Sequence, residues 1–152
     1  VVLDIDMHHG QGIQGIFCPR DDIFSISIHG DPLNFYPGVS GHASEVGEGV
    51  GTGFNLNIPL PHGSDAATFF QALDQALAAA NTFAPQAMVL AMGFDTYRED
   101  PQSKMTIDTP DFATMAQRLV RCGWPTAILF EGGYHAATFQ HNAPTFLQHC
   151  QR

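Results

Sequence analysis

Short apolar runs that end in polar side chains constrain the fold of this chain more than any other feature. Val1–Asp6, Met88–Met92 and Thr126–Phe130 are rich in aliphatic residues, and Ile23–His29 and Phe54–Ile58 have a similar character. Runs of this kind are typical of strands buried in a parallel sheet. In open sheets of parallel strands, ligands lie outside the carboxyl ends of the strands. Side chains that follow these runs are therefore expected to meet at one rim.

Helical patterns lie between the later strands. Apolar residues recur at helical spacing over Ala66–Phe83, directly after a capping residue at Asp65. A second helix opens at Thr109, and a last helix is expected from Ala143 to Gln151. The alternation of strands and helices predicts an α/β fold with a mainly parallel sheet flanked by helices, in a single domain over residues 1–152.

A long loop interrupts this pattern between Pro32 and Gly53. Its sequence, PLNFYPGVSGHASEVGEGVGTG, contains two prolines and six glycines. A loop of this length in a compact domain is usually functional or mobile. Its glycines precede a strand rather than follow one, and no Gly-Lys-Ser/Thr is present. The loop therefore does not indicate a nucleotide-binding site.

The charge balance narrows the classes of ligand. The formal net charge is −9, from 6 basic and 15 acidic residues. This argues against binding to a nucleic-acid backbone, which needs a basic surface, and suits a small cationic substrate or a basic peptide. Charged residues make up 14% of the chain, well below the usual proportion of about a quarter. We therefore expect much of the surface to be covered by another chain, as in a homo-oligomer, or by a further part of the same fold.

The cysteines and the apolar segments predict a cytoplasmic protein. Cys18, Cys122 and Cys150 form no CxxC pair and are odd in number, which favours free thiols in a reducing compartment. The apolar stretches are too short to span a bilayer, and the first residues lack the features of a signal peptide. We expect no membrane contact.

Polar side chains follow three of the expected strands. In a strand, residues i, i+2 and i+4 share a face, so Asp4, Asp6 and His8 point the same way. Asp6 and His8 can ligate one ion, and Asp95 can supply a third ligand from another strand. Tyr134 brings a phenol to the same rim. Two carboxylates and an imidazole with an open position are typical of a catalytic metal site. Asp4 lies deeper, where it supports these ligands or holds a second cation.

A simpler interpretation applies to each aspartate taken alone, because an Asp at a strand end is often only a cap for a helix or a turn. The joint occurrence of DxDxHH, GFD and GGY at three strand ends favours a metal site. His29 ends a strand at the same rim, and whether it supports the ligands stays open. Arg98, Glu99 and Asp100 are expected to form a solvated turn.

Longer motifs carry a family resemblance. DIDMHHGQGIQGIF, SISIHG, FYPGVSG, NLNIPLPHGS, GFDTYREDP and EGGY stand in the order found in the zinc-dependent histone deacetylase superfamily. The HASEVGEGVGTG loop and the FDTYREDP stretch look most like its bacterial acetylpolyamine amidohydrolase branch. The resemblance covers nearly the whole chain. It implies a partial arginase/deacetylase-like fold that corresponds to the C-terminal portion of the catalytic domain.

The resemblance also implies roles for individual residues. Asp6, His8 and Asp95 match the zinc ligands of the family. Tyr134 matches the tyrosine that donates a hydrogen bond to the substrate carbonyl and then to the tetrahedral oxyanion. Asp4 and Ser27 match side chains of a buried potassium site. The residues implied to line the substrate tunnel are Phe35 or Tyr36, Gly132 and Gly133.

One departure from the family concerns the general base. In the family it belongs to a tandem histidine pair that precedes the DxDxHH strand, and no such pair precedes Asp4 in this sequence. His8 and His9 match the ligand motif instead, and His9 is expected to face the opposite side of the strand. Because Val1 already reads as the inside of a buried strand, we expect an N-terminal portion of a larger fold to be absent.

Two functions remain open on this sequence. The first is a zinc-dependent deacetylase that acts on a small acetylated amine, such as an acetylpolyamine, or on an acetyl-lysine peptide. As an isolated chain it would be weak or inactive, because a positioned general base typically contributes about 10²–10⁴-fold in rate. The second is a non-catalytic metal-binding or structural remnant, which would self-associate through an edge at Val1–Asp6.

Overall fold

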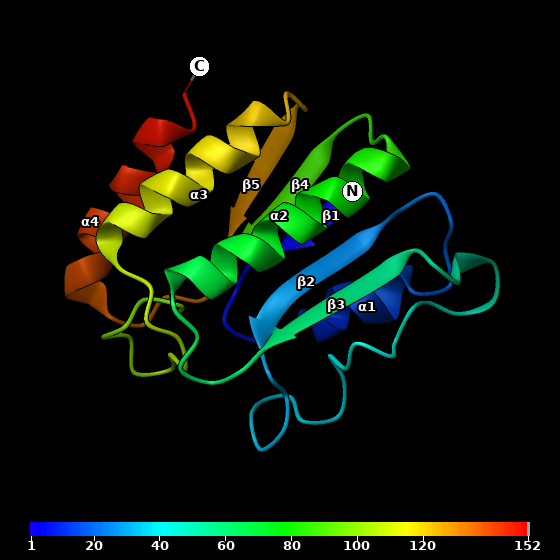
Figure 1. Cartoon of the computed structure of the whole chain (residues 1–152), viewed down its shortest axis with the longest axis horizontal. Coiled ribbons are helices and arrows are strands. Elements are labelled where there is room, and N and C mark those ends of the chain that lie inside the picture. Colours follow the sequence, from blue (N-terminus) through cyan, green and yellow to red (C-terminus); the bar gives the residue numbers. More distant parts are fainter. Residues whose placement is uncertain (152) are drawn as a thin grey trace.

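The computed structural model describes residues 1–151, and it contains a five-stranded sheet with the strand order β3-β2-β1-β4-β5 (Figure 1). Every strand pairing is parallel. The strands are β1 (Val2–Asp4), β2 (Ser25–Gly30), β3 (Asn55–Leu60), β4 (Met88–Met92) and β5 (Thr126–Phe130). The sheet confirms the predicted α/β fold class, and each expected strand is present with bounds that agree within two residues.

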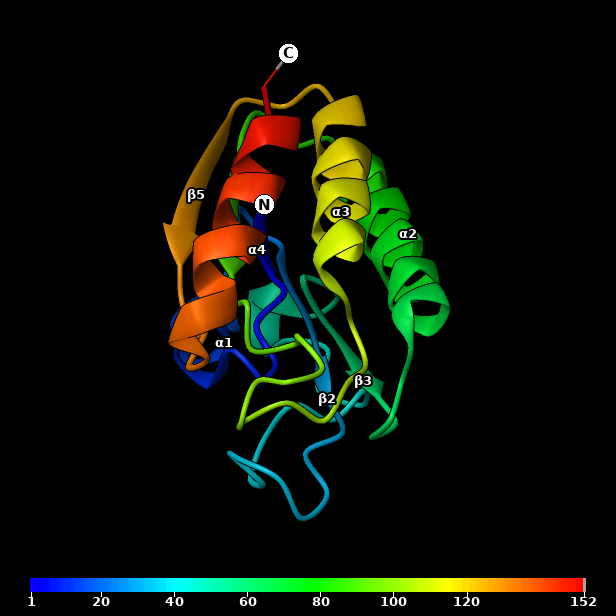
Figure 2. The same ribbon diagram turned by 90° about the vertical axis from the view of Figure 1, so that its left-hand side faces the viewer.

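Helices lie on both faces of the sheet. Figure 2 shows α2 (Ala66–Phe83) and α3 (Thr109–Arg121) on one face, whereas α1 (Gln11–Phe17) lies on the other. The last helix, α4 (Ala136–His149), packs against α3 beside β5. A single 3₁₀ turn, η1 (Gly49–Gly51), is the only helical element that the structure places in the long loop. No helix within residues 1–151 is long and apolar enough to cross a membrane.

The strand β1 lies at the centre of the sheet, between β2 and β4. In register, Asp4 is paired with Ser27 on one side and with Ala91 on the other. All residues of β1 are buried, as expected for an apolar run in the middle of a parallel sheet. The expectation that Val1–Asp6 forms an exposed edge is therefore wrong, because β3 and β5 are the two edges.

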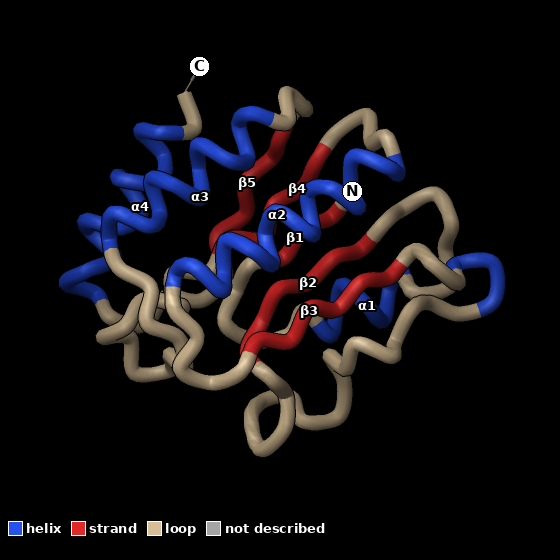
Figure 3. Tube along the Cα trace, in the orientation of Figure 1, coloured by secondary structure: helices blue, strands red, loops and turns tan. Residues whose placement is uncertain are grey.

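The carboxyl ends of β1, β4 and β5 are neighbours at one end of the sheet. Figure 3 shows loops gathered beyond this end. Because β4 pairs with both β1 and β5, the segments that follow these strands lie next to one another although they are far apart in the sequence. The fold thus produces the single rim that the sequence predicts.

The two long helices begin at the residues that the sequence predicts. The Asp65 carboxylate accepts a hydrogen bond from the backbone N–H of Thr68 at 2.9 Å, which caps α2. The α3 helix starts at Thr109, and its cap is Asp108, which forms a capping box with Asp111. Both helices direct large apolar side chains, including Phe69 and Phe112, into the core.

Two helices differ from the prediction. The last helix begins at Ala136 rather than Ala143, so that Pro144 lies inside it. Phe139 and Phe146 of this helix pack edge-on against Phe94, and this burial offsets the backbone hydrogen bond that the proline cannot make. The short helix α1 was not predicted, because its glycines disfavour a helix and none of its residues is buried.

The strand β5 also differs from the expectation that every apolar run is buried. It pairs with β4 along one side only. Most of its side chains are exposed, including Leu129 and Phe130. Its residues are typical of a parallel strand, but its position at an edge of the sheet leaves apolar side chains exposed.

The histidine at the end of β2 anchors the long loop. His29 is fully buried, its Nδ1 lies 2.9 Å from the Ser27 hydroxyl, and its Nε2 lies 2.9 Å from the carbonyl oxygen of Gly41. The carbonyl can only accept, so Nε2 carries the proton and Nδ1 accepts from Ser27. Burial lowers the pKa of His29 to about 4. A neutral His29 therefore ties the loop to the sheet.

This anchor predicts a loss of stability in mild acid. Below the ordinary pKa of 6.5, the unfolded chain protonates His29, whereas the folded chain does not until about pH 4. His29 therefore contributes a loss of folding stability on the order of 2 kcal/mol as the pH falls from 7 to 5. This contribution is the difference in pH dependence between the unmodified chain and His29→Gln, measured by urea unfolding at the two pH values. The exposed control His141→Gln should keep the pH dependence of the unmodified chain. Equal pH dependence in both variants would contradict the assignment.

Candidate metal centre

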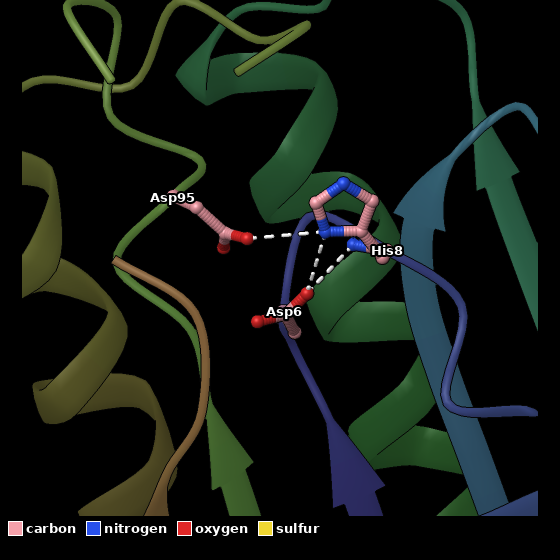
Figure 4. Close-up of side chains that lie close together, drawn as sticks. All are labelled: Asp6, His8 and Asp95. Carbon is pink, nitrogen blue, oxygen red and sulfur yellow. Dashed lines mark hydrogen bonds and ion pairs between the residues drawn. The ribbon is translucent and has the colours of Figure 1, made fainter. Parts of the chain in front are cut away.

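Three predicted ligands converge at the rim of the sheet. One ligand atom from each of Asp6, His8 and Asp95 lies within 4.8 Å of the others. The Nδ1 atom of His8 is 3.2 Å from Oδ1 of Asp6 and 3.2 Å from Oδ2 of Asp95. In Figure 4 the two carboxylates and the imidazole point toward one another from the segments that follow β1 and β4. Within residues 1–151 this is the only cluster of three such ligands.

The backbone holds both carboxylates in place. Asp6 accepts hydrogen bonds from the N–H of His8 at 2.8 Å and from the N–H of Gly132 at 2.7 Å. Asp95 accepts from the N–H of Met7 at 3.0 Å. Each carboxylate is thus held by a segment that follows another strand of the sheet, and this fixes the geometry of the cluster before any ion binds.

The electrostatics of the cluster favour a cation between the carboxylates. The hydrogen bond to Asp6 and the close approach of the Asp95 carboxylate raise the pKa of His8 to about 9. Burial raises the pKa of Asp95. Burial also acts to raise the pKa of Asp6, but hydrogen bonds from His8 and Gly132 outweigh it and the pKa lies below its usual value. A protonated His8 here supplies the positive charge that two adjacent carboxylates require.

The residues of the cluster fit a divalent metal. Asp95 is fully buried, and its Oδ2 atom makes no hydrogen bond of acceptable geometry, although His8 lies near it. A buried carboxylate oxygen without a hydrogen-bond donor is costly, and coordination of an ion would satisfy it. Two carboxylates and one imidazole are a donor set that Zn²⁺ accepts, with a position left open for another ligand.

Tyr134 lines the same cleft as Asp6 and His8. The cleft has a volume of about 850 Å³. Tyr134 itself is exposed, and partial burial together with the charges of Asp95 and Asp6 raises the pKa of its phenol. The phenol therefore stays protonated near neutral pH and can donate a hydrogen bond into the cleft.

The two aromatic residues predicted for the tunnel occupy different places. The ring of Phe35 stacks on the His8 imidazole, with centroids 4.9 Å apart and planes 14° apart. Tyr36 meets the same imidazole edge-on at 5.8 Å, lines the cleft, and accepts a hydrogen bond from Gln11 at 2.7 Å. Phe35 therefore orients the His8 ring, and of the two aromatic residues Tyr36 is the one that lines the cleft.

Glycines next to the ligands allow the segments to approach closely. A Cβ atom at Gly132 would overlap the carboxylate oxygens of Asp95 and Asp6. Gly133 has φ of +148°, a conformation that side chains disfavour. Gly93, which the sequence did not single out, is equally restricted, since a Cβ there would overlap Asp6. The only sign of this restriction in the sequence is that Gly93 directly precedes Phe94 and Asp95.

The two residues of the predicted second cation site lie on adjacent strands. Asp4 on β1 is directly opposite Ser27 on β2, and both are buried. Burial raises the pKa of Asp4 to about 8, and its Oδ1 atom accepts a hydrogen bond from the N–H of Asp6 at 3.0 Å. The Ser27 hydroxyl is engaged by His29. A cation at this pair stays a prediction.

Two other residues at the rim, His9 and Asp100, are held by hydrogen bonds to residues outside the ligand cluster. His9 lies outside the ligand cluster, with its ring nitrogens 3.0 Å from the Ser40 hydroxyl and 3.0 Å from the Gln14 side-chain oxygen, although it lines the same cleft as His8. Asp100 is buried and hydrogen-bonded, so the expected solvated turn is wrong at this residue. Two of its three partners lie 34 and 35 positions later in the chain, and no local pattern could have identified these two.

A second hollow lies away from the ligands. Its volume is about 410 Å³, and it is lined mainly by apolar residues of α3, β5 and the segment between them, including Leu119, Trp124 and Ile128. It contains no ligand of the cluster. We place the chemistry in the larger cleft, because the Asp6 carboxylate, the His8 imidazole and the Tyr134 phenol line it.

Comparison with known proteins identifies the family. The family described as "Histone deacetylase domain" matches residues 1–150. The chain belongs to the histone deacetylase family. This confirms the predicted resemblance, and the structure described here is the part of a histone deacetylase domain that carries the Asp6, His8 and Asp95 cluster.

The relatives fall in the predicted branch. An acetylpolyamine amidohydrolase of Burkholderia pseudomallei is 51% identical over 95% of this chain and 42% of its own length. Acetylpolyamine amidohydrolase 1 of Pseudomonas aeruginosa is 47% identical over 97% of this chain and 42% of its own. The crystal structure of the acetylpolyamine aminohydrolase from B. pseudomallei superposes with a TM-score of 0.97 at 50% identity, over 98% of this chain and 44% of that one. The chain thus spans less than half the length of these relatives.

The cluster predicts stoichiometric zinc binding. We expect one Zn²⁺ per chain, and Asp95→Ala should weaken binding by more than the roughly 10–100-fold that loss of an outer-shell partner costs, because it removes a direct ligand. Titration with elemental analysis measures the stoichiometry. Zinc should also raise the melting temperature of the unmodified chain but not that of Asp95→Ala.

The control for this experiment is Asp21→Ala, which removes an exposed carboxylate far from the cluster in the sequence. It should bind zinc as the unmodified chain does. Zinc binding of unchanged affinity in Asp95→Ala would exclude the cluster as the metal site.

Proposed function

We propose that this chain carries the metal-binding and carbonyl-orienting part of a zinc-dependent amidohydrolase that removes acetyl groups from acetylated amines. The observation that carries the proposal is the convergence of Asp6, His8 and Asp95 within 4.8 Å at the wall of a cleft that Tyr134 also lines. Membership of the histone deacetylase family and the names of the relatives support it.

The proposed division of labour follows from the residues. Asp6, His8 and Asp95 would hold Zn²⁺, which supplies Lewis-acid chemistry that polarises an amide carbonyl. The protonated phenol of Tyr134 donates a hydrogen bond to the carbonyl oxygen, and this bond strengthens as negative charge develops there. Phe35 keeps the His8 ring in one orientation by stacking on it.

The surroundings of the cleft suit a cationic substrate. Asp6 and Glu131 line it, and among the described residues no Lys or Arg does. The chain as a whole carries a formal charge of −9. Negative potential at a cleft raises the local concentration of cations. We therefore propose an acetylated polyamine as the substrate class, with an acetyl-lysine peptide as the alternative.

Residues 1–152 alone are expected to hydrolyse such amides slowly. The histidines nearest the ligands do not offer a free base, because His8 faces two carboxylates and both ring nitrogens of His9 are engaged. The family resemblance assigns the base to a tandem pair before the DxDxHH strand. Loss of a positioned base reduces the rate by roughly 10²–10⁴-fold.

Acetate release from a monoacetylated diamine and from an acetyl-lysine peptide tests this function. Tyr134→Phe should lower the rate by roughly 10²–10³-fold, the cost of one oxyanion donor, while zinc content stays the same. Tyr97→Phe is the matched control, because this buried tyrosine follows β4 but does not line the cleft. No release above buffer by the zinc-loaded chain, or equal rates in Tyr134→Phe and the unmodified chain, would refute the proposal for this polypeptide.

A second function, that of a non-catalytic protein that self-associates, has one supporting observation. The edge strand β5 exposes Leu129 and Phe130, which are 53% and 45% accessible. Unpaired edge strands with apolar side chains readily pair with another chain. Sedimentation should then detect dimers that Leu129→Lys disrupts, whereas Leu33→Lys, which alters a more exposed loop residue, should leave them intact. A monomer at all concentrations would exclude this function.

A potassium site and a cytoplasmic location are also proposed. A potassium ion at Asp4 and Ser27 is supported by their pairing in register and by the burial of both side chains. Cytoplasmic location is supported by free thiols at Cys18, Cys122 and Cys150, which suit a reducing compartment.

A further inference from the structure

Asp100 is a buried carboxylate whose hydrogen-bond partners are all backbone N–H groups. Asp100 is 6% accessible, and within the described residues its carboxylate accepts hydrogen bonds from the main chain only. The Oδ2 atom accepts from the N–H of Tyr134 at 2.6 Å and from the N–H of His135 at 3.0 Å. The Oδ1 atom accepts from the N–H of Gln102 at 2.9 Å. Arg98, the nearest basic residue in the sequence, pairs instead with Asp108 at 2.6 Å. The carboxylate is therefore committed to the backbone at Tyr134.

The same loop carries a metal ligand at its start and Asp100 at its end. The loop leaves β4 through Asp95, and two tight turns follow, in which Tyr97 N–H donates to the Phe94 carbonyl and Asp100 N–H donates to the Tyr97 carbonyl. Asp95 and Asp100 are thus joined by a short, internally bonded segment. One end of it faces the metal cluster, and the other holds the residue that would bind the substrate carbonyl.

Asp100 holds the part of the segment before α4 that lies beyond the restraints on Gly132. At Gly132, the N–H donates to Asp6 at 2.7 Å and the carbonyl accepts from Phe94 at 2.7 Å. Beyond Gly132 comes Gly133, whose backbone freedom would allow the chain to pivot. The two N–H groups held by Asp100 follow directly after this pivot.

We propose that Asp100 is a positioning residue, which fixes the backbone of Tyr134 relative to Asp95 so that the phenol is aimed at the substrate carbonyl. This inference rests on the proposed function for its catalytic consequence. Its structural part, the clamp between the two loops, stands on the hydrogen bonds alone. Charge-assisted hydrogen bonds from backbone amides to a carboxylate are among the stronger restraints available to a loop, and a displacement of about 1 Å can cost about 100-fold in rate.

A competing explanation is that Asp100 only caps α4, since Tyr134 and His135 directly precede Ala136. A cap stabilises the helix but has no specific effect through the phenol. The two explanations differ in one respect: positioning acts only while Tyr134 has its hydroxyl, whereas capping acts whatever side chain residue 134 carries.

The clamp itself, meaning the hydrogen bonds from the N–H groups of Tyr134 and His135 to Asp100, is tested first on the unmodified chain. Amide hydrogen exchange is measured for each residue. The amides of Tyr134 and His135 should be protected, whereas the exposed amide of Glu99 should exchange freely. Unprotected amides at Tyr134 and His135 would overturn the proposal whether or not the chain is an enzyme, and they would do so even if every variant failed to fold.

Variants then test the link to the phenol. The chain has three tyrosines, so 3-fluorotyrosine labelling gives three fluorine signals, and Tyr134→Phe identifies the relevant one. Asp100→Asn, which leaves only one acceptor oxygen, should shift or broaden that signal without changing zinc content. Glu99→Gln removes a neighbouring exposed carboxylate and should leave all three signals unchanged. An unaltered Tyr134 signal in Asp100→Asn would overturn the proposal.

The catalytic part is tested by a double-mutant cycle. Asp100→Asn should lower kcat by about 10–100-fold with KM nearly unchanged, and Glu99→Gln should match the unmodified chain. In the Tyr134→Phe background, Asp100→Asn should cause no further loss, because the donor that it positions is gone. An equal loss in both backgrounds would favour the capping explanation and overturn positioning. If the unmodified chain releases no acetate, the proposed function fails, and the exchange and fluorine results still decide whether Asp100 clamps Tyr134.

Discussion

Two carboxylates held near one imidazole nitrogen are the constraint on which the rest of this structure depends. Asp6 and Asp95 repel each other and lie largely out of water, so their proximity requires compensation. Backbone N–H groups of His8, Gly132 and Met7 supply part of it. The remainder needs positive charge, which a protonated His8 provides and a divalent cation would provide better. The repulsion between these two buried carboxylates is thus a reason to regard the cluster as a metal centre and not as a structural ion pair.

The sheet makes this arrangement stable by placing β1 between β2 and β4. Both faces and both sides of the strand are covered, so the segment that leaves it is anchored at its origin. Polar anchors then hold the loops: His29 ties the loop after β2, and Asp100 ties the segment after β5 to the one after β4. Each anchor is a buried polar side chain with its partners satisfied, which is how a rigid site can be built from loops.

The local features of the sequence predicted most elements well. The apolar runs located all five strands, and Asp65 located the start of α2. The start of α4 was missed because Pro144 suggests a helix beginning, whereas contacts of Phe139 and Phe146 with Phe94 decide where the helix forms. The exposure of β5 was missed because strand composition carries no information about which strand lies at an edge. Family resemblance, not periodicity, assigned individual roles to the site residues.

By itself, the sequence determined that apolar strands alternate with helices and that an aspartate, a histidine and a second aspartate follow strand ends. These features depend on side-chain type and spacing along a few residues, which local propensity and period can express. Only the tertiary structure decided that β4 lies beside both β1 and β5, that His8 Nδ1 faces two carboxylates, and that Asp100 is buried against Tyr134. Those facts depend on contacts between residues far apart in the chain, and such contacts arise only when the strands pair and the loops pack together.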